Sequence, residues 1–201
     1  MARTLGWAVM SLLALGVAGY AFAGVAGFRS PFVEALFAEK ALRAFGHLAA
    51  GGVAIIAGAL QFSTRLRFDR PVVHRTLGKV YVVAALISGT AGGLLAVRST
   101  GGVTAHFGFG LLAFLWIATS VIAYTSVRSG DYAAHRGWMI RSYALCLAAV
   151  MLRIYLPIFG VAGVPFELSY PAISWLCWVP NIIVAEWLVV GSTLAPLEPA
   201  D

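Results

Sequence analysis

Long apolar runs alternate with short polar stretches along the whole chain. A run of about 20 apolar residues is the length that a helix needs to cross the hydrocarbon core of a bilayer. We therefore predict an all-α fold, a single transmembrane domain over residues 1–201. We expect spans two to five to form a four-helix, cofactor-binding core. The six predicted spans are 5–27, 43–62, 76–98, 104–126, 136–157 and 171–194.

The composition supports an integral membrane protein. Hydrophobic residues make up 61% of the chain and charged residues only 11%, with a mean hydropathy of +0.89. Soluble domains average roughly 45–50% apolar and 25% charged residues. Six spans leave almost nothing outside the membrane, so the sequence predicts no soluble catalytic domain.

The first apolar run has features of a secretory signal peptide. Arg3 precedes it, and Ala21-Phe22-Ala23 resembles a cleavage site. The apolar character continues to Gly27, however, and this is long enough to span. We therefore expect the segment to be retained as the first span.

Two connections carry their own predictions. Pro31 breaks the chain after the first span, and residues 32–42 are amphipathic enough for an interfacial helix that runs into the second span. Residues 158–170 are interrupted by glycine and proline, which predicts an outer loop that caps the bundle.

The net charge of +6 could indicate a nucleic-acid partner, but its distribution argues against one. Six alternating spans place most of the basic residues on one side, and the positive-inside tendency assigns that side to the cytoplasm, with both termini. The inner set is Arg3, Arg65, Arg67, Arg70, Arg75, Lys79, Arg128, Arg136 and Arg141. The outer set is Arg29, Lys40, Arg43, Arg98 and Arg153.

The four histidines of the chain fall at alternating ends of consecutive spans. His47 and His106 lie near the outer ends of spans two and four, and His74 and His135 near the inner ends of spans three and five. In an antiparallel four-helix bundle, alternate helices are diagonal partners. We therefore expect His47 to face His106 and His74 to face His135.

Two facing neutral imidazoles in an apolar bundle suit bis-axial ligation of a haem iron. The two iron positions would lie roughly 20 Å apart along the membrane normal. Gly51, Gly78 and Gly110 each follow a histidine by four residues, where a bare backbone leaves room for a porphyrin edge. His135 has Met139 at that offset instead.

The order and sidedness of these histidines resemble the cytochrome b561 superfamily. That resemblance implies two b-type haems, an outer one held by His47 and His106 and an inner one held by His74 and His135. It also implies transmembrane oxidoreductase activity, with electrons passing from a cytoplasmic or quinol donor to an outer acceptor. The extended ascorbate-site motif of that superfamily is not found here, so the donor stays open.

Four longer motifs stand out along the chain: HRTLGKVYV at 74–82, GDYAAHRGWMIRSYAL at 130–145, RIYLP at 153–157 and WVPNIIVAEW at 178–187. With these motifs the chain as a whole resembles an uncharacterised bacterial membrane family, number 2306 in the domain-of-unknown-function series. The resemblance implies a bacterial inner (plasma) membrane location and brings no activity with it.

Several arginines lie near the histidines or within spans. Arg75 and Arg136 directly follow the inner histidines and would neutralise haem propionates, or serve only as topology signals and lipid-phosphate anchors. Arg153 lies near the outer pair and would hold a propionate or an anionic substrate, or extend to the outer headgroups. We predict that Arg141 and Glu186 lie at similar depth and form an ion pair, which would fix the fifth and sixth spans or leave Glu186 a role in proton relay.

Two rival functions stay open. The histidines could bind zinc or non-haem iron in a membrane enzyme or metal carrier, although only Asp69 and Asp131 offer carboxylates near the inner pair. The chain could instead be a non-catalytic subunit that binds lipid or quinone. Membrane lipid is an expected partner in every case, and the oligomeric state stays open, with a homodimer as one option. Cys146 and Cys177 are interpreted as small core residues.

Overall fold

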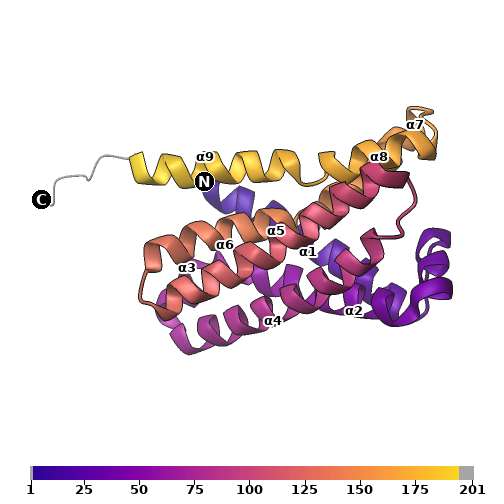
Figure 1. Ribbon diagram of the computed structural model, residues 1–201. Coiled ribbons are helices and arrows are strands. Elements are labelled where there is room, and N and C mark those ends of the chain that lie inside the picture. The colour runs from indigo at the N-terminus through magenta and orange to yellow at the C-terminus, as the bar shows by residue number, and fades with distance from the viewer. Residues whose placement is uncertain (1, 195–201) are drawn as a thin grey trace, which may run out of the picture.

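The computed structural model describes residues 2–194, which form helices joined by short turns (Figure 1). The helices are α1 (Ala2–Val25), α2 (Pro31–Gln61), α3 (Thr64–Asp69), α4 (Pro71–Ala96), α5 (Gly102–Arg128), α6 (Tyr132–Cys146), α7 (Ala148–Val161), α8 (Phe166–Leu176) and α9 (Val179–Leu194). Six stretches of the described chain are long and apolar enough to cross a membrane, which confirms the predicted all-α, six-span fold. The fifth span combines α6 with α7, and the sixth combines α8 with α9.

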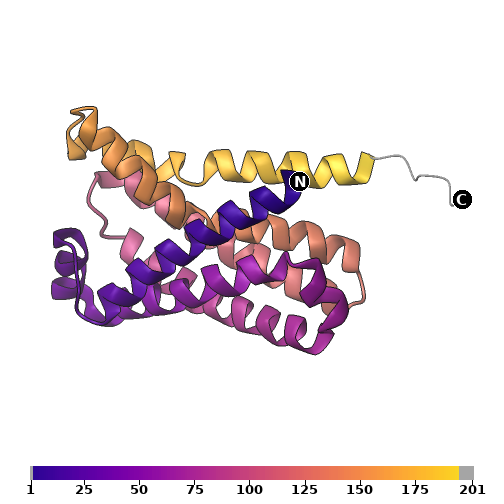
Figure 2. The ribbon, with the colours of Figure 1, turned by 180° about the vertical axis from the view of Figure 1, so that it is seen from behind.

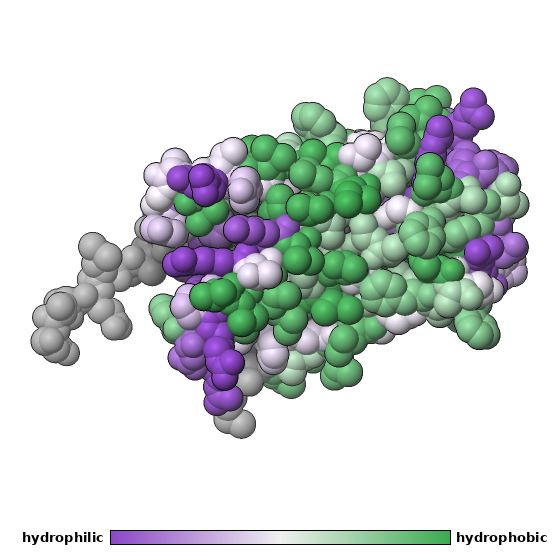
Figure 3. Space-filling view, turned by 90° about the horizontal axis from the view of Figure 1, so that it is seen from below, coloured by the Kyte–Doolittle hydropathy of each residue, from purple (hydrophilic) through white to green (hydrophobic). Residues whose placement is uncertain are grey.

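The spans run back and forth along one axis, so the turns gather at two ends (Figures 1 and 2). We call the end that holds α3 and the turn between α5 and α6 the basic end, because Arg67, Arg70 and Arg128 lie there. The other end, with the connections 26–30, 97–101 and 162–165, is the opposite end. Figure 3 shows hydrophilic residues gathered at both ends and hydrophobic residues between them. This distribution matches a protein whose middle contacts lipid.

Side-chain caps explain where several helices begin. Ser30 accepts a hydrogen bond from the Val33 backbone N–H, and Pro31 supplies the first residue of α2. Asp131 accepts from the Ala134 backbone N–H at 2.9 Å and so starts α6. Such caps satisfy backbone donors that a helix leaves unpaired at its first turn.

Two predicted connections have different outcomes. The helix expected over residues 32–42 is present and runs into the second span as α2, with a bend at Lys40, whose φ of −147° and ψ of 49° are not helical. The loop expected over residues 158–170 is wrong for most of its length. Helix α7 continues through Pro157 to Val161, and α8 begins at Phe166. Pro157 and Pro171 lie inside α7 and α8. Membrane-spanning helices tolerate such prolines because neighbouring groups can satisfy the backbone carbonyl that proline leaves unpaired.

The last two spans are each interrupted near their middle. In the sixth span, α8 ends at Leu176 and α9 begins at Val179. Pro180 explains this break, because its ring nitrogen cannot donate to the carbonyl of Leu176. The fifth span breaks at Leu147 without a glycine or proline there.

Four helices form the centre of the bundle. Helix α2 packs on α4, α4 on α5 and α5 on α6, and α6 also touches α2. This order makes α2 and α5 one diagonal pair and α4 and α6 the other. The arrangement is the one expected for spans two to five.

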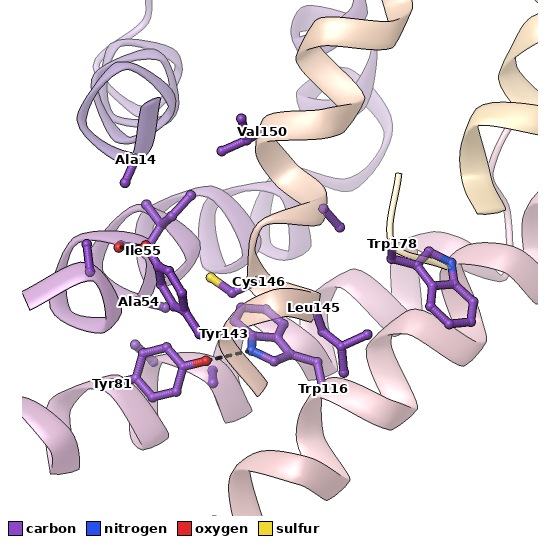
Figure 4. Packing of buried hydrophobic residues seen from close by; sticks show 14 of the residues in the cluster. Ala14, Ala54, Ile55, Tyr81, Trp116, Tyr143, Leu145, Cys146, Val150 and Trp178 are labelled. Atoms are coloured by element: carbon purple, nitrogen blue, oxygen red, sulfur yellow. Dashed lines mark hydrogen bonds between the residues drawn. The ribbon is translucent and has the colours of Figure 1, made fainter. Parts of the chain in front are cut away.

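A hydrogen-bonded group of side chains fills the middle of these four helices. Figure 4 shows two of its members, Tyr81 and Trp116, among the buried hydrophobic residues. The Tyr81 hydroxyl lies 2.7 Å from the Ser142 hydroxyl and accepts from the Trp116 indole at 3.2 Å. Ser120 joins Ser142 at 2.8 Å. Because all four side chains are buried, their bonds satisfy groups that would otherwise be costly inside a membrane. Cys146 and Cys177 are free and buried, as expected for core residues.

Helices α1 and α9 flank the four central helices. The Trp7 indole on α1 donates to the carbonyl of Ala59 on α2 at 3.1 Å. Arg141 of α6 binds Glu186 of α9 through two bonds, Nε to Oε1 at 2.6 Å and Nη2 to Oε2 at 2.7 Å. The predicted Arg141–Glu186 ion pair is therefore confirmed, and it ties α9 to α6.

Candidate cofactor-binding sites

The four histidines lie on the two diagonal helix pairs. His47 on α2 and His106 on α5 lie toward the opposite end, and His74 on α4 and His135 on α6 lie toward the basic end. All four side chains are half-buried. Each diagonal thus carries one histidine per helix near the same end of the bundle.

His47 is held against α4 by its Nδ1 atom. This nitrogen lies 3.0 Å from the carbonyl oxygen of Ser88 and 3.2 Å from the Ser88 hydroxyl. The same hydroxyl donates to the His47 carbonyl at 2.9 Å. Gly92 makes this approach possible, because a Cβ there would lie only 2.9 Å from His47 Nδ1.

His106 and His135 are each anchored by one backbone carbonyl. His106 Nε2 lies 3.0 Å from the Ser99 carbonyl, in the connection before its own helix. His135 Nδ1 lies 2.8 Å from the Ala123 carbonyl on α5. His74 differs, because its Nδ1 atom is buried with no hydrogen-bond partner in the structure. His135 lies within electrostatic range of His74.

These anchors decide which ring nitrogens can bind a metal. A carbonyl oxygen only accepts hydrogen bonds, so the nitrogen bonded to it must carry the proton. The second nitrogen of a neutral imidazole then keeps its lone pair. His47 and His135 present Nε2 in this way, and His106 presents Nδ1. Metal-binding histidines commonly have such a carbonyl on their other nitrogen.

A cavity of about 360 Å³ lies beside His47, and we call it the His47 cavity. Its walls come from all four central helices and from α1, α7 and α8. Most lining residues are apolar, with Phe109, Trp116 and Leu152 among the larger ones. The volume falls within the range of about 300–1,000 Å³ that is typical of small-molecule sites. His106 does not line this cavity, although its partner Ser99 does.

Arg153 joins His47 in lining the cavity. Its Nη1 donates to the Ala149 carbonyl at 2.7 Å, and its guanidinium lies 4.8 Å from the centre of the Tyr20 ring. Its Nε is buried without a hydrogen-bond partner. The expected proximity of Arg153 to the outer histidine level is thus present at His47.

The glycines that follow three histidines have different surroundings. A Cβ at Gly51 would lie 3.0 Å from the Ser88 hydroxyl, and one at Gly78 would lie 3.3 Å from Gln61 Oε1. A Cβ at Gly110 would meet nothing within 4 Å. Protein side chains therefore lie beside the first two, and the role of these glycines in admitting a macrocycle stays a prediction.

Arg75 and Arg136 are exposed at the basic end, next to His74 and His135 in the chain. Arg75 and Arg67 both lie within electrostatic range of His74. Exposed cations here can meet either a cofactor carboxylate or a lipid phosphate.

The donor set bears on which group the histidines could hold. Among residues 2–194, as far as their side chains are described, no three His, Cys, Asp or Glu side chains gather in one place. Zinc sites take three or four protein ligands, whereas a bis-ligated haem takes two. Three of the four imidazoles, those of His47, His106 and His135, have one anchored nitrogen, and their second nitrogen stays available to a ligand.

The partners of the histidines were not predicted from the sequence. Ser88 fixes His47, and the carbonyls of Ser99 and Ala123 fix His106 and His135. The backbone carbonyls leave no signal in a sequence. Ser88 could have been noticed as a polar residue in an apolar span.

Comparison with known proteins gives one family. A family model described as "Predicted membrane protein (DUF2306)" matches residues 44–189. No curated protein and no solved structure matches the chain.

Proposed function

The chain belongs to the DUF2306 family of predicted membrane proteins, and from the placement of its four histidines we propose that it is a b-type dihaem transmembrane electron-transfer protein. In this proposal it is an oxidoreductase that moves electrons between a cytoplasmic or quinol donor and an acceptor on the outer side. It resides in the bacterial inner membrane with both termini in the cytoplasm, which is also the side of the basic end.

The observation that supports the proposal is the placement of one histidine on each of the four central helices, at alternating ends of the bundle. His47 and His106 occupy one diagonal and one end, and His74 and His135 occupy the other diagonal and the other end. Three of the four rings have one nitrogen at 2.8–3.0 Å from a backbone carbonyl, which leaves the second nitrogen free to bind iron. The Nδ1 atom of His74 has no hydrogen-bond partner, so this nitrogen would be available to bind iron at the inner site.

Other residues of the chain would serve the bound groups. Bound haem supplies reversible one-electron iron chemistry. Arg75 and Arg136 would neutralise carboxylates at the basic end, where both side chains are exposed. The His47 cavity offers space next to one outer ligand, and Phe109 and Trp116 in its wall are aromatic.

The centre of the bundle separates the two proposed sites. Tyr81, Trp116, Ser120 and Ser142 bond to one another between the two histidine levels and leave no polar group free among them. This packed layer would keep water from crossing between the sites, which a protein that carries electrons across a membrane requires.

The test is a transmembrane electron-transfer measurement. The purified chain, loaded with haem, is placed in liposomes with ferricyanide trapped inside and a reduced quinol outside, with empty liposomes as control. We expect ferricyanide reduction to depend on the protein and b-type bands to appear in the reduced-minus-oxidised spectrum. A protein that binds no haem under these conditions contradicts the proposal.

A further inference from the structure

The His47 cavity is rich in cations and poor in counter-ions. The residues that line it include Lys40, Arg98 and Arg153 but one carboxylate, Glu39. Glu39 is exposed and lies 3.2 Å from Lys40, so it already has a partner. The cavity is therefore positive at its polar positions while most of its wall is apolar.

Arg153 is a half-buried cation that lines this cavity. It lies on α7, whereas Arg98 lies in the connection between α4 and α5, and it lines the same cavity as His47. Its described contacts are the Ala149 carbonyl and the Tyr20 ring, and no carboxylate pairs with it among the described residues. A half-buried cation without an anion is costly, and its buried, unpartnered Nε adds to that cost. An anionic hydrogen-bond acceptor in the cavity would lower both the cost of the unpaired charge and the cost of the unpartnered Nε.

We propose that the His47 cavity binds the carboxylate of an otherwise apolar ligand, held by Arg153. Arginine suits this task because its planar fork donates two parallel bonds to a carboxylate. The apolar walls contributed by α1, α2 and α7 take the body of the ligand. Two sources carry this chemistry, a long-chain fatty acid of the membrane and the propionate side chain of a haem at the outer histidines. The second source rests on the proposed function, and the first does not.

The first arm of the test uses palmitate and hexadecanol, which differ in the carboxylate. Native mass spectrometry of the purified, haem-free full chain measures the adduct of each. If the membrane is the source, palmitate binds about tenfold or more tightly than hexadecanol. Arg153→Gln removes this preference, Arg153→Lys keeps part of it, and Arg43→Gln leaves it unchanged. Arg43 is a matched control because it is exposed near the same end and does not line the cavity.

The second arm uses haem b and its dimethyl ester in a His135→Ala background, where only the outer pair is intact. If haem is the source, the free acid binds about tenfold or more tightly than the ester, and Arg153→Gln removes that preference. Thermal unfolding shows whether Arg153→Gln is folded, which we expect because the substitution removes an unpaired buried charge.

The outcomes separate the two proposals. A preference for the carboxylate form that depends on Arg153 supports the proposed site. The arm in which it appears shows whether the carboxylate comes from a fatty acid or from haem. No preference in both arms, or a preference that persists in Arg153→Gln, overturns it. Failure of the electron-transfer proposal instead appears as absence of haem whatever residue occupies position 153.

Discussion

The Nδ1 atom of His47 lies 3.0 Å from the carbonyl oxygen of Ser88, so a ring of the second span is held by the backbone of the third. The Ser88 hydroxyl closes the contact by donating to the His47 carbonyl at 2.9 Å. This arrangement fixes both the orientation of the ring and the nitrogen that keeps a lone pair. It depends on Gly92, which leaves the space that the ring occupies.

Gly92→Ala should therefore displace His47. The added Cβ would lie 2.9 Å from His47 Nδ1, closer than side chains tolerate, so the ring must shift and lose its Ser88 bond. Loss of a partner of a metal-binding histidine typically costs about 10–100-fold in affinity. We expect a haem titration of the purified variant to show one weakened site and one unchanged site.

Gly93→Ala is the matched control for this prediction. A Cβ at Gly93 would meet the Ala113 Cβ at 3.5 Å, an ordinary contact. Equal haem affinity of the two variants would show that the ring position at His47 does not matter for binding.

The Arg141–Glu186 pair should contribute to stability by tying α9 to α6. Its two short bonds are bidentate, and the exposed side-chain fractions are 19% for Arg141 and 45% for Glu186. Because Glu186→Gln leaves the Arg141 charge within a span without its partner, we expect a cost of about 3–5 kcal/mol, the range for breaking a buried pair. Thermal unfolding in detergent measures this cost.

A double-mutant cycle with Arg141→Gln separates the pair from its surroundings, since the double variant leaves no unpaired charge. Glu34→Gln is a control, because the Arg29–Glu34 pair has one bond at 3.4 Å and Glu34 is 62% exposed. We expect a cost within about 0.5 kcal/mol there. Additive effects of the Arg141 and Glu186 changes would refute the pair's role.

The spans and their order were predictable because a bilayer imposes one length and one polarity on every crossing segment. The same constraint made the Arg141–Glu186 pair predictable, since a charge within a span needs a partner at its own depth. The residues at which the helices begin and end were harder to predict from the sequence. Helix α2 begins at Pro31, well before the predicted span at 43, because the amphipathic segment continues it through the bend at Lys40.

The candidate sites were predictable only as far as the helix order goes. Alternating histidines on successive spans placed His47 and His106 on one diagonal and His74 and His135 on the other. The carbonyl anchors were not predictable, because a backbone carbonyl leaves no signal in the sequence; only the Ser88 hydroxyl is a side-chain feature that the sequence displays. The His47 cavity also had no sequence signal, since its walls come from seven helices.

Tyr81→Phe should destabilise the bundle without changing its topology. The variant loses the hydroxyl that accepts from the Trp116 indole and bonds Ser142, so the buried indole N–H is left without a partner. A buried donor left unsatisfied costs about 1–3 kcal/mol. Thermal unfolding measures the loss, with Tyr124→Phe as control because Tyr124 is exposed. A Tyr81→Phe protein as stable as Tyr124→Phe would mean that the central hydrogen bonds contribute nothing.

The most direct measurement of the central claim is the ratio of haem to protein, by pyridine haemochrome assay, in the purified wild-type chain and its four single His→Ala variants. The account predicts two b-type haems per chain in the wild type. It predicts one in each of His47→Ala, His106→Ala, His74→Ala and His135→Ala, with the two members of a diagonal losing the same spectral component. A wild-type chain without b-type haem, or a ratio that none of the four substitutions changes, would contradict it.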